Sequence, residues 1–243
     1  MKKTSLAEKL ARKSFESAAI QQSWQVHLNA FGPMLRDSFP ENYLAKTHLC
    51  AALNRISRRD GEGGRAKLAE LTKHLELPMD HAAYHFFTAL SFEAEGNMGD
   101  ALTRYRQCCG YEPDFYMPWV KLAKLSQTAQ DYDAAEKGWC KAVSLAPTPA
   151  HKAVFLTNLC GCLTCMKKLD EACTALMESR RLAPVQPGRD AVAAIYYAAR
   201  GDAENAENCL SWVEKDNPAL CRSTRAVVEK ILSGEDPASA SQG

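Results

Sequence analysis

The feature that most constrains the fold is a set of positions that recurs with a period of about 34 residues. Proline recurs at Pro113, Pro147, Pro184 and Pro218, with a short insertion between the second and the third. Small residues keep the same spacing in two further positions, which are Ala89, Ala123, Cys160 and Ala194, and Ala101, Ala135, Ala172 and Ala206. Bulky residues keep it at Tyr105, Trp139, Leu176 and Leu210. Self-similarity of this length indicates stacked units, each of which buries its apolar face on its neighbour.

The apolar residues between the prolines follow a helical period. Leu156, Leu159 and Leu163, for example, are three and then four residues apart, so they share one helix face. No sustained alternation of period two bounded by hairpin turns occurs, so strands are not indicated. Each repeat therefore predicts two antiparallel helices, and proline follows the second because it cannot continue the hydrogen-bond ladder. Gly96 and Gly201 are predicted at the turn inside the hairpin.

Residues 116–147 resemble most closely the tetratricopeptide repeat, a helix-turn-helix of about 34 residues with the signature W-x2-L-G-x2-Y, then A-x3-F, then P. The residues that match are Trp119, Leu122, Ala123, Ala135, Trp139 and Pro147. Ser126 replaces the signature tyrosine, and Asp190 occupies the tryptophan position of the last copy. The resemblance covers about residues 82–218 and implies an all-α fold, an α-α superhelix (a TPR solenoid) of stacked helical hairpins.

The chain is expected to divide along this repeat. The expected parts are an N-terminal helix (1–33), a degenerate helical hairpin (41–78), four repeat units (82–218), a C-terminal capping helix (219–232) and a flexible tail (233–243). The four units are 82–113, 116–147, 153–184 and 187–218. The turn of the degenerate hairpin is predicted at the glycine-rich stretch 61–64.

The N-terminal segment allows three interpretations. Residues 4–30 are compatible with one long helix that ends at Gly32-Pro33. Its modest amphipathicity suits a cap packed on the array, and the alternatives are a segment for homodimerisation or partner binding, and disorder.

Charge and cysteine usage exclude several classes of partner. Lys and Arg number 30 against 29 Asp and Glu, so no net field would gather nucleic acid or an anionic membrane. The N-terminus has no apolar stretch of the signal-peptide type. A bilayer span needs about 20 apolar residues, and the longest uncharged stretch, between Lys152 and Lys167, is shorter than that. We therefore expect a cytoplasmic protein, with ten cysteines as free thiols.

A cysteine cluster supplies the main alternative to a binding function. Cys160, Cys162 and Cys165 lie in one predicted helix, and Cys173 lies across the hairpin, so a metal- or redox-linked accessory protein is conceivable. Packing is the favoured interpretation, because a redox Cys-x-x-Cys sits at a helix N-terminus after a strand.

No catalytic motif is recognisable. His81 and His85 are one helical turn apart but lack the glutamate of a zinc protease, and no P-loop or nucleophile elbow occurs. The sequence therefore predicts a protein that is not an enzyme, with no cofactor and no metal.

The resemblance places a peptide-binding groove on the first helices of the units, which line the concave side of such arrays. The predicted groove residues are Phe86, Leu90, Glu93, Met117, Val120, Lys121, Lys124, Val154, Thr157, Asn158, Gly161, Ala191 and Ile195. Most are apolar, which suits an amphipathic helix or an extended hydrophobic segment of another protein. The predicted function is a noncatalytic scaffold, adaptor or chaperone-like protein.

Two alternatives for these residues stay open. The protein's own N-terminal helix could occupy the groove, or the residues could belong to the core of the array. An RNA-binding array would use Lys121 and Lys124 with the basic cluster of Arg55, Arg58, Arg59, Arg65 and Lys67, but the near-zero net charge disfavours it.

Overall fold

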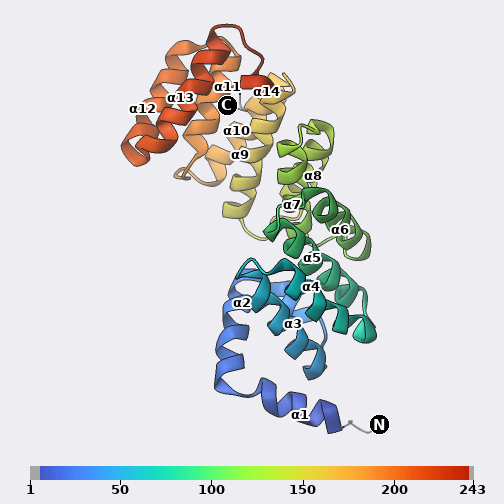
Figure 1. The fold of residues 1–243 in the computed structure, drawn as a ribbon. Helices are drawn as coiled ribbons and strands as arrows, with labels where there is room; N and C mark the ends of the chain where they lie inside the picture. Colours follow the sequence, from blue (N-terminus) through green and yellow to red (C-terminus); the bar gives the residue numbers. More distant parts are fainter. Residues whose placement is uncertain (1–5, 241–243) are drawn as a thin grey trace. The chain divides into compact units, whose positions relative to one another are not determined.

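The computed structural model describes residues 6–240 and is entirely helical over that range, with no strand (Figure 1). The predicted all-α class is confirmed, and successive helices pack as adjacent pairs. Contacts divide the chain into two compact units, unit 1 (Met1–Pro118) and unit 2 (Trp119–Gly243).

Unit 1 contains two helical hairpins and the N-terminal helices. Its elements are α1 (Leu6–Phe15), α2 (Ala18–Asp37), α3 (Tyr43–Ile56), α4 (Gly61–Ala69), the 3-10 helix η1 (Glu70–His74), α5 (Pro78–Ala94) and α6 (Met98–Tyr111). The hairpins are α3 with α4 and α5 with α6, and α4 also packs on α5.

Unit 2 continues the same pattern. Its elements are α7 (Tyr116–Thr128, which begins in unit 1), α8 (Tyr132–Ser144), α9 (Pro149–Cys165), α10 (Leu169–Leu182), α11 (Arg189–Ala199), α12 (Ala203–Asp216), α13 (Pro218–Leu232) and α14 (Pro237–Ala240). α9 pairs with α10 and α11 with α12, while α9 also contacts α8 and α11. α13 packs on both α11 and α12, as expected of a helix that covers the last hairpin.

The repeating small residues lie where helices approach closely. All eight alanine and cysteine residues of the two small positions are fully buried. Gly138 shows why size is limited there, because an added Cβ would lie 2.9 Å from the Cβ of Ala123. Larger side chains at such contacts would strain the hairpin by about 1–3 kcal/mol.

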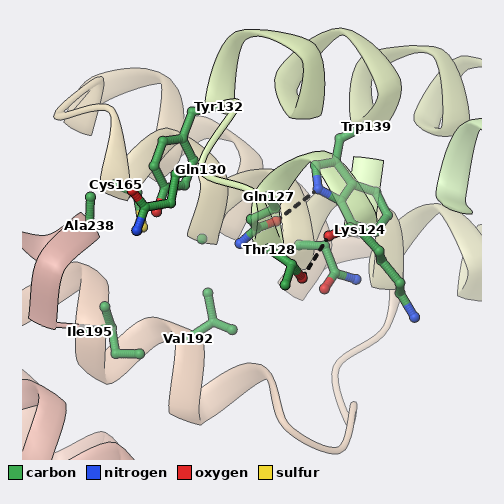
Figure 2. Close-up of a pocket in the computed structure, with 12 residues that line it drawn as sticks. Lys124, Gln127, Thr128, Gln130, Tyr132, Trp139, Cys165, Val192, Ile195 and Ala238 are labelled. Carbon is green, nitrogen blue, oxygen red and sulfur yellow. Dashed lines mark hydrogen bonds between the residues drawn. The ribbon is translucent and has the colours of Figure 1, made fainter. Parts of the chain in front are cut away.

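The repeating bulky residues fill the space between helices, and the polar ones bond to the first helix of their hairpin. Trp139 donates its indole N–H to Oε1 of Gln127 at 3.1 Å (Figure 2). Tyr105 donates its hydroxyl to Oε2 of Glu93 at 2.9 Å. Buried aromatic residues with a polar group need such an acceptor.

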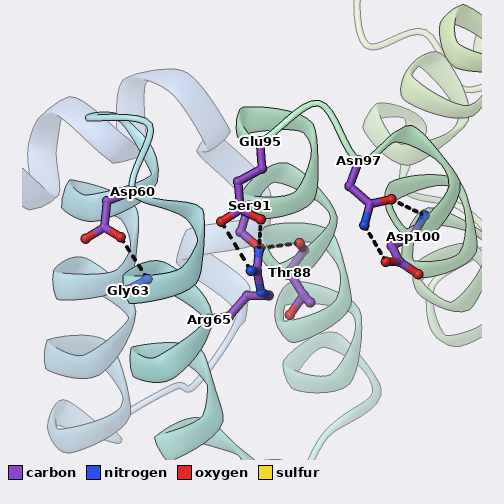
Figure 3. Close-up of polar contacts among 8 residues, drawn as sticks. All are labelled: Asp60, Gly63, Arg65, Thr88, Ser91, Glu95, Asn97 and Asp100. Carbon is purple, nitrogen blue, oxygen red and sulfur yellow. Dashed lines mark hydrogen bonds and ion pairs between the residues drawn. The ribbon is translucent and has the colours of Figure 1, made fainter.

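The turns inside the hairpins repeat more regularly than their sequence suggests. The residues with a left-handed backbone there are Arg59, Gly96, Gln130, Lys167 and Gly201, each separated from the next by the length of one repeat. The next residue caps the second helix by accepting a hydrogen bond from the backbone N–H three residues on, at Asp60, Asn97, Asp131 and Asp202. Figure 3 shows the caps at Asp60 and Asn97. Lys168 is the exception and makes no side-chain cap.

The structure corrects the predicted turn at residues 61–64. These glycines lie inside α4, and the turn precedes them at Arg59 and Asp60. Gly64 precedes Ala101 by the length of one repeat and so belongs to the small positions, where an added Cβ would come within 2.6 Å of Ile56. A Cβ on Gly61 would collide with the backbone oxygen of Ser91 on α5. The glycines therefore permit close helix packing rather than a turn.

The prediction of one long N-terminal helix is also wrong. The helix is interrupted between α1 and α2. There the side-chain amide of Gln21 donates a hydrogen bond to the backbone oxygen of Phe15, and the Phe15 ring packs edge-on against Trp24 at 5.3 Å between ring centres. The predicted interruption at Gly32 is confirmed, because the backbone is non-helical there (φ of 31°) and α2 consists of two helical stretches that meet at this kink, the second of which ends at Asp37.

The C-terminal tail is ordered in part. α14 forms where a flexible tail is expected, and its Pro237 and Ala240 are buried. Residues 241–243 of that predicted tail, like residues 1–5, lie outside the described residues.

Candidate functional site

The first helices of three successive hairpins, α7, α9 and α11, line a hollow of about 740 Å³ in unit 2 (Figure 2). We call it the unit 2 groove. Its lining residues are Lys124, Gln127, Thr128, Gln130, Tyr132, Trp139, Asn158, Gly161, Cys165, Val192, Ile195 and Ala238. Its size is within the range of ligand-binding pockets.

The two sides of the unit 2 groove differ in polarity. α7 contributes Lys124, Gln127 and Thr128, whereas α11 contributes the apolar Val192 and Ile195 on the opposite side (Figure 2). Lys124 is exposed, and among the described lining residues it is the one with a formal charge at neutral pH. The groove therefore combines an apolar wall, a neutral polar wall and one cation.

Gly161 leaves the middle of the unit 2 groove open. It lies on α9 between the two walls, and an added Cβ would meet Val192 at an ordinary contact distance of 3.5 Å. A longer side chain there would extend into the hollow, so this position determines how deep a partner can reach.

α14 borders one end of the unit 2 groove through Ala238. The segment is held by an ion pair between Lys167 and Asp236 at 2.7 Å, and by a weak contact of the Cys165 thiol with the backbone oxygen of Pro237 at 4.0 Å. No sequence pattern signals this role for α14.

Unit 1 contains a smaller hollow of about 340 Å³ on α3 and α5. We call it the unit 1 groove, and its lining residues are His27, Phe31, Leu53, Ile56, Ser57, Arg59, Leu90, Glu93 and Ala94. His27 and Phe31 belong to α2, which packs on α3 and α5. The N-terminal helix thus covers the inner face of the unit 1 hairpins, as one of the open alternatives supposed.

The contacts of α2 are specific. Phe31 packs edge-on against Phe87 at 5.1 Å between ring centres. Oδ1 of Asn54 lies 2.8 Å from Oγ of Ser23 and 3.0 Å from Nε2 of His27. α2 is therefore a helix seated on the first-helix face of a hairpin pair, and not a loosely attached extension.

The two grooves use the same positions of the repeat. Leu53, Leu90, Lys124, Gly161 and Ile195 are each separated from the next by the length of one repeat, and all five line a groove. One turn further on, a second position does the same with Ser57, Ala94, Thr128 and Cys165. One face of the repeat is thus covered by α2 in unit 1, whereas in unit 2 only α14 borders it within the described range.

The predicted groove residues are distributed between these two sites and the core. Lys124, Asn158, Gly161 and Ile195 line the unit 2 groove, and Leu90 and Glu93 line the unit 1 groove beside α2. Phe86, Thr157 and Ala191 are buried, so their predicted exposure is wrong. The residues that line neither groove are these three with Met117, Val120, Lys121 and Val154.

Thr157 can be buried because its hydroxyl has hydrogen-bond partners inside the hairpin. Its hydroxyl lies 2.9 Å from that of Ser179 on α10 and 3.1 Å from the backbone oxygen of Ala153. The lining residues that the sequence analysis missed include Gln127 and Thr128. Their spacing of three and four residues from Lys124 would have placed them on its helix face.

The cysteine cluster has the chemistry of a packed core. Burial raises the pKa of Cys160 and of Cys162 to about 12, so both thiols stay protonated at neutral pH. Cys160 occupies the small position at which α9 meets α10. Within residues 6–240, no group of three or more His, Cys, Asp or Glu side chains is arranged to hold a metal.

The histidine pair takes part in ring stacking, and arginines of the basic cluster take part in ion pairs. His81 and His85 both stack on Tyr111, at 4.6 and 5.5 Å between ring centres. In the basic cluster, Arg55 pairs with Asp60 at 2.8 Å and Arg65 pairs with Glu95 at 2.7 Å. These ion pairs reduce the positive charge that an RNA would meet.

No protein-family model matches the chain, and no curated protein matches it. In the part of the chain that the structure describes, no helix has the length and apolar character needed to cross a bilayer.

Proposed function

We propose that this chain is a noncatalytic interaction module, an adaptor or chaperone-like scaffold, that holds a segment of another protein in the unit 2 groove. One observation carries the proposal. The repeat face that binds the chain's own helix α2 in unit 1 is the face that lies open in unit 2. The resemblance to tetratricopeptide repeats points in the same direction.

The chemistry of the groove supports binding rather than catalysis. General acid–base chemistry near neutral pH relies on groups such as imidazole or a shifted carboxyl. The described lining of the unit 2 groove has no histidine and no carboxylate, and its single thiol, Cys165, contacts the C-terminal segment. Its amides, hydroxyls and apolar side chains suit the recognition of a polypeptide. The proposal places the protein in the cytoplasm, where its ten thiols would stay reduced.

Site-specific photo-crosslinking in cells of the native host tests the proposal. A photoreactive amino acid replaces Thr128, which lines the groove, or Ser211, an exposed residue of α12 that serves as the matched control. Both hydroxyls bond only to a backbone oxygen in their own helix, so both substitutions should be tolerated. We expect crosslinked partners from position 128 that are absent from position 211, and their loss when Gly161→Leu fills the groove. Equal yields from both positions, or crosslinks that Gly161→Leu leaves unchanged, would contradict the proposal.

A further inference from the structure

α2 shows what kind of segment the repeat face can hold. Its inward side chains recur every three or four residues, as in an amphipathic helix laid in a groove. Before the kink at Gly32, the residues of α2 on this side include Trp24, His27 and Phe31, of which Trp24 and His27 are buried. His27 and Phe31, four residues apart, reach the position occupied by Leu53 and Leu90.

The same position has a different chemistry in unit 2. Where unit 1 has two leucines, unit 2 has Lys124, Gly161 and Ile195. The position therefore changes along the groove from a cation to an open space and then to an apolar side chain. A helix that fits it needs an anionic residue over α7 and large apolar residues over α9 and α11.

The charge of Lys124 determines which charge the partner residue over α7 should carry. A basic residue over α7 would face Lys124, and no carboxylate among the described lining residues would compensate it. An acidic residue would pair with Lys124 at the rim, where complementary charge determines specificity and association rate.

The groove favours a helix over an extended strand. An extended segment gains its main-chain hydrogen bonds from an exposed sheet edge. Residues 6–240 contain no strand, and the helices that line the groove satisfy their own backbone groups. A helical partner likewise satisfies its own backbone and needs only side-chain contacts.

We infer that the occupant of the unit 2 groove is an amphipathic helix of another protein, with an acidic residue facing Lys124 and a large apolar residue over Gly161. This inference rests on the proposed function and specifies the class of partner.

Synthetic helices derived from α2 supply the probes. The first is a fluorescent peptide with the sequence of residues 18–37, and the other two carry His27→Glu or His27→Lys in that peptide. Binding to the full chain is measured by fluorescence anisotropy, and peptide helicity by circular dichroism. We expect the Glu peptide to bind about tenfold more tightly than the Lys peptide and to gain helicity on binding.

Variants of the chain locate the binding. Lys124→Glu should reverse the preference between the two peptides, whereas Lys137→Glu, an exposed lysine of α8, should not. Gly161→Leu should weaken the Glu peptide at least about tenfold by filling the groove. Gly110→Leu, at a glycine of α6 with open space around it, should not. Lys124 is exposed, so its variant remains informative even if Gly161→Leu reduces stability.

Three outcomes would overturn the inference. The first is a preference for the Glu peptide over the Lys peptide that does not change in Lys124→Glu, and the second is binding without a gain of helicity. The third is tightest binding by the unmodified peptide, which would instead identify the α2 helix of a second copy as the occupant. Partner crosslinks from position 128 could persist in each case. The proposed function would then stand with a different class of partner, whereas loss of those crosslinks would remove both.

Discussion

Trp139 and Gln127 are joined by a 3.1 Å hydrogen bond that connects the second helix of a hairpin to the first. The bond of Tyr105 to Glu93 has the same place in the preceding repeat. In each pair the bulky residue fills the space between helices while its polar atom fixes the spacing between them. Gln127 and Glu93 also line the two grooves, so each bond fixes the position of a side chain in a groove wall.

Replacement of Tyr105 by Phe should measure the strength of this connection. The substitution keeps the ring and removes the hydroxyl that donates to the half-buried carboxylate of Glu93, which should lower the free energy of unfolding by about 1–2 kcal/mol. Urea denaturation gives the value. Tyr111→Phe is the control, because that ring is exposed and acts by stacking on His81. Equal stability of the two variants would show that packing alone maintains the hairpin.

The glycines of helices should separate into two classes on substitution by alanine. Gly61→Ala brings a Cβ onto the backbone oxygen of Ser91 and should cost about 1–3 kcal/mol. Gly110→Ala meets open space in α6 and should stabilise the protein by up to about 1 kcal/mol, since alanine is the better helix former. Thermal unfolding of both variants tests the assignment of Gly61 to a helix contact. A stabilised Gly61→Ala would contradict the assignment of Gly61 to a close helix contact.

Acid should destabilise the protein through His85. Burial, with a smaller contribution from Arg104 and His81, lowers the pKa of His85 to about 4. The folded state therefore keeps this imidazole neutral, while the unfolded chain binds a proton below about pH 6.5. Stability due to this group is complete above pH 6.5 and is lost between pH 6.5 and 4.

His85→Phe isolates that contribution. The variant keeps an aromatic ring against Tyr111 and removes the titrating group. Because the side chain is only half-buried, we expect the acid-dependent loss to shrink by no more than about 2 kcal/mol. Urea unfolding of both proteins at pH 7 and pH 5 measures it. An unchanged loss in the variant would assign the acid sensitivity to other groups.

The regular part of the fold was predictable because it depends on residue size at fixed intervals. The small and bulky positions at Ala123 and Trp139 identify the contact between two helices whatever the turn between them contains. The turns between the helices could be predicted only in part. Gly96 and Gly201 signal a left-handed backbone, but Gln130 and Lys167 adopt it too, at a cost that helix packing offsets.

The site was less predictable than the fold, because the position of a residue in the repeat does not show whether its side chain is buried or exposed. Lys124 and Ile195 line the unit 2 groove as expected. Phe86 lies on the corresponding face of its own helix, but it is buried there and packs against Phe31 of α2. Whether an inner-face residue is exposed depends on which segment covers it. The coverage by α2 and α14 arises from contacts far apart in sequence, such as that of Lys167 with Asp236.

The ion pair between Lys167 and Asp236 should control the opening of α14 at the end of the unit 2 groove. The Lys167 side chain is largely exposed and that of Asp236 partly exposed, so the pair contributes only about 0.2–1 kcal/mol. Because α14 has just four residues, we expect it to open locally. Asp236→Lys should therefore raise amide exchange in residues 238–240 about twofold to fivefold without a change in global stability. The double variant Lys167→Asp with Asp236→Lys should restore only part of the protection, because it rebuilds the ion pair but not the hydrogen bond that Oδ1 of Asp236 accepts from the backbone N–H of Ala238 at 2.9 Å. Hydrogen–deuterium exchange by mass spectrometry distinguishes the cases, and equal protection in all three proteins would mean that burial of Pro237 and Ala240 alone holds the segment.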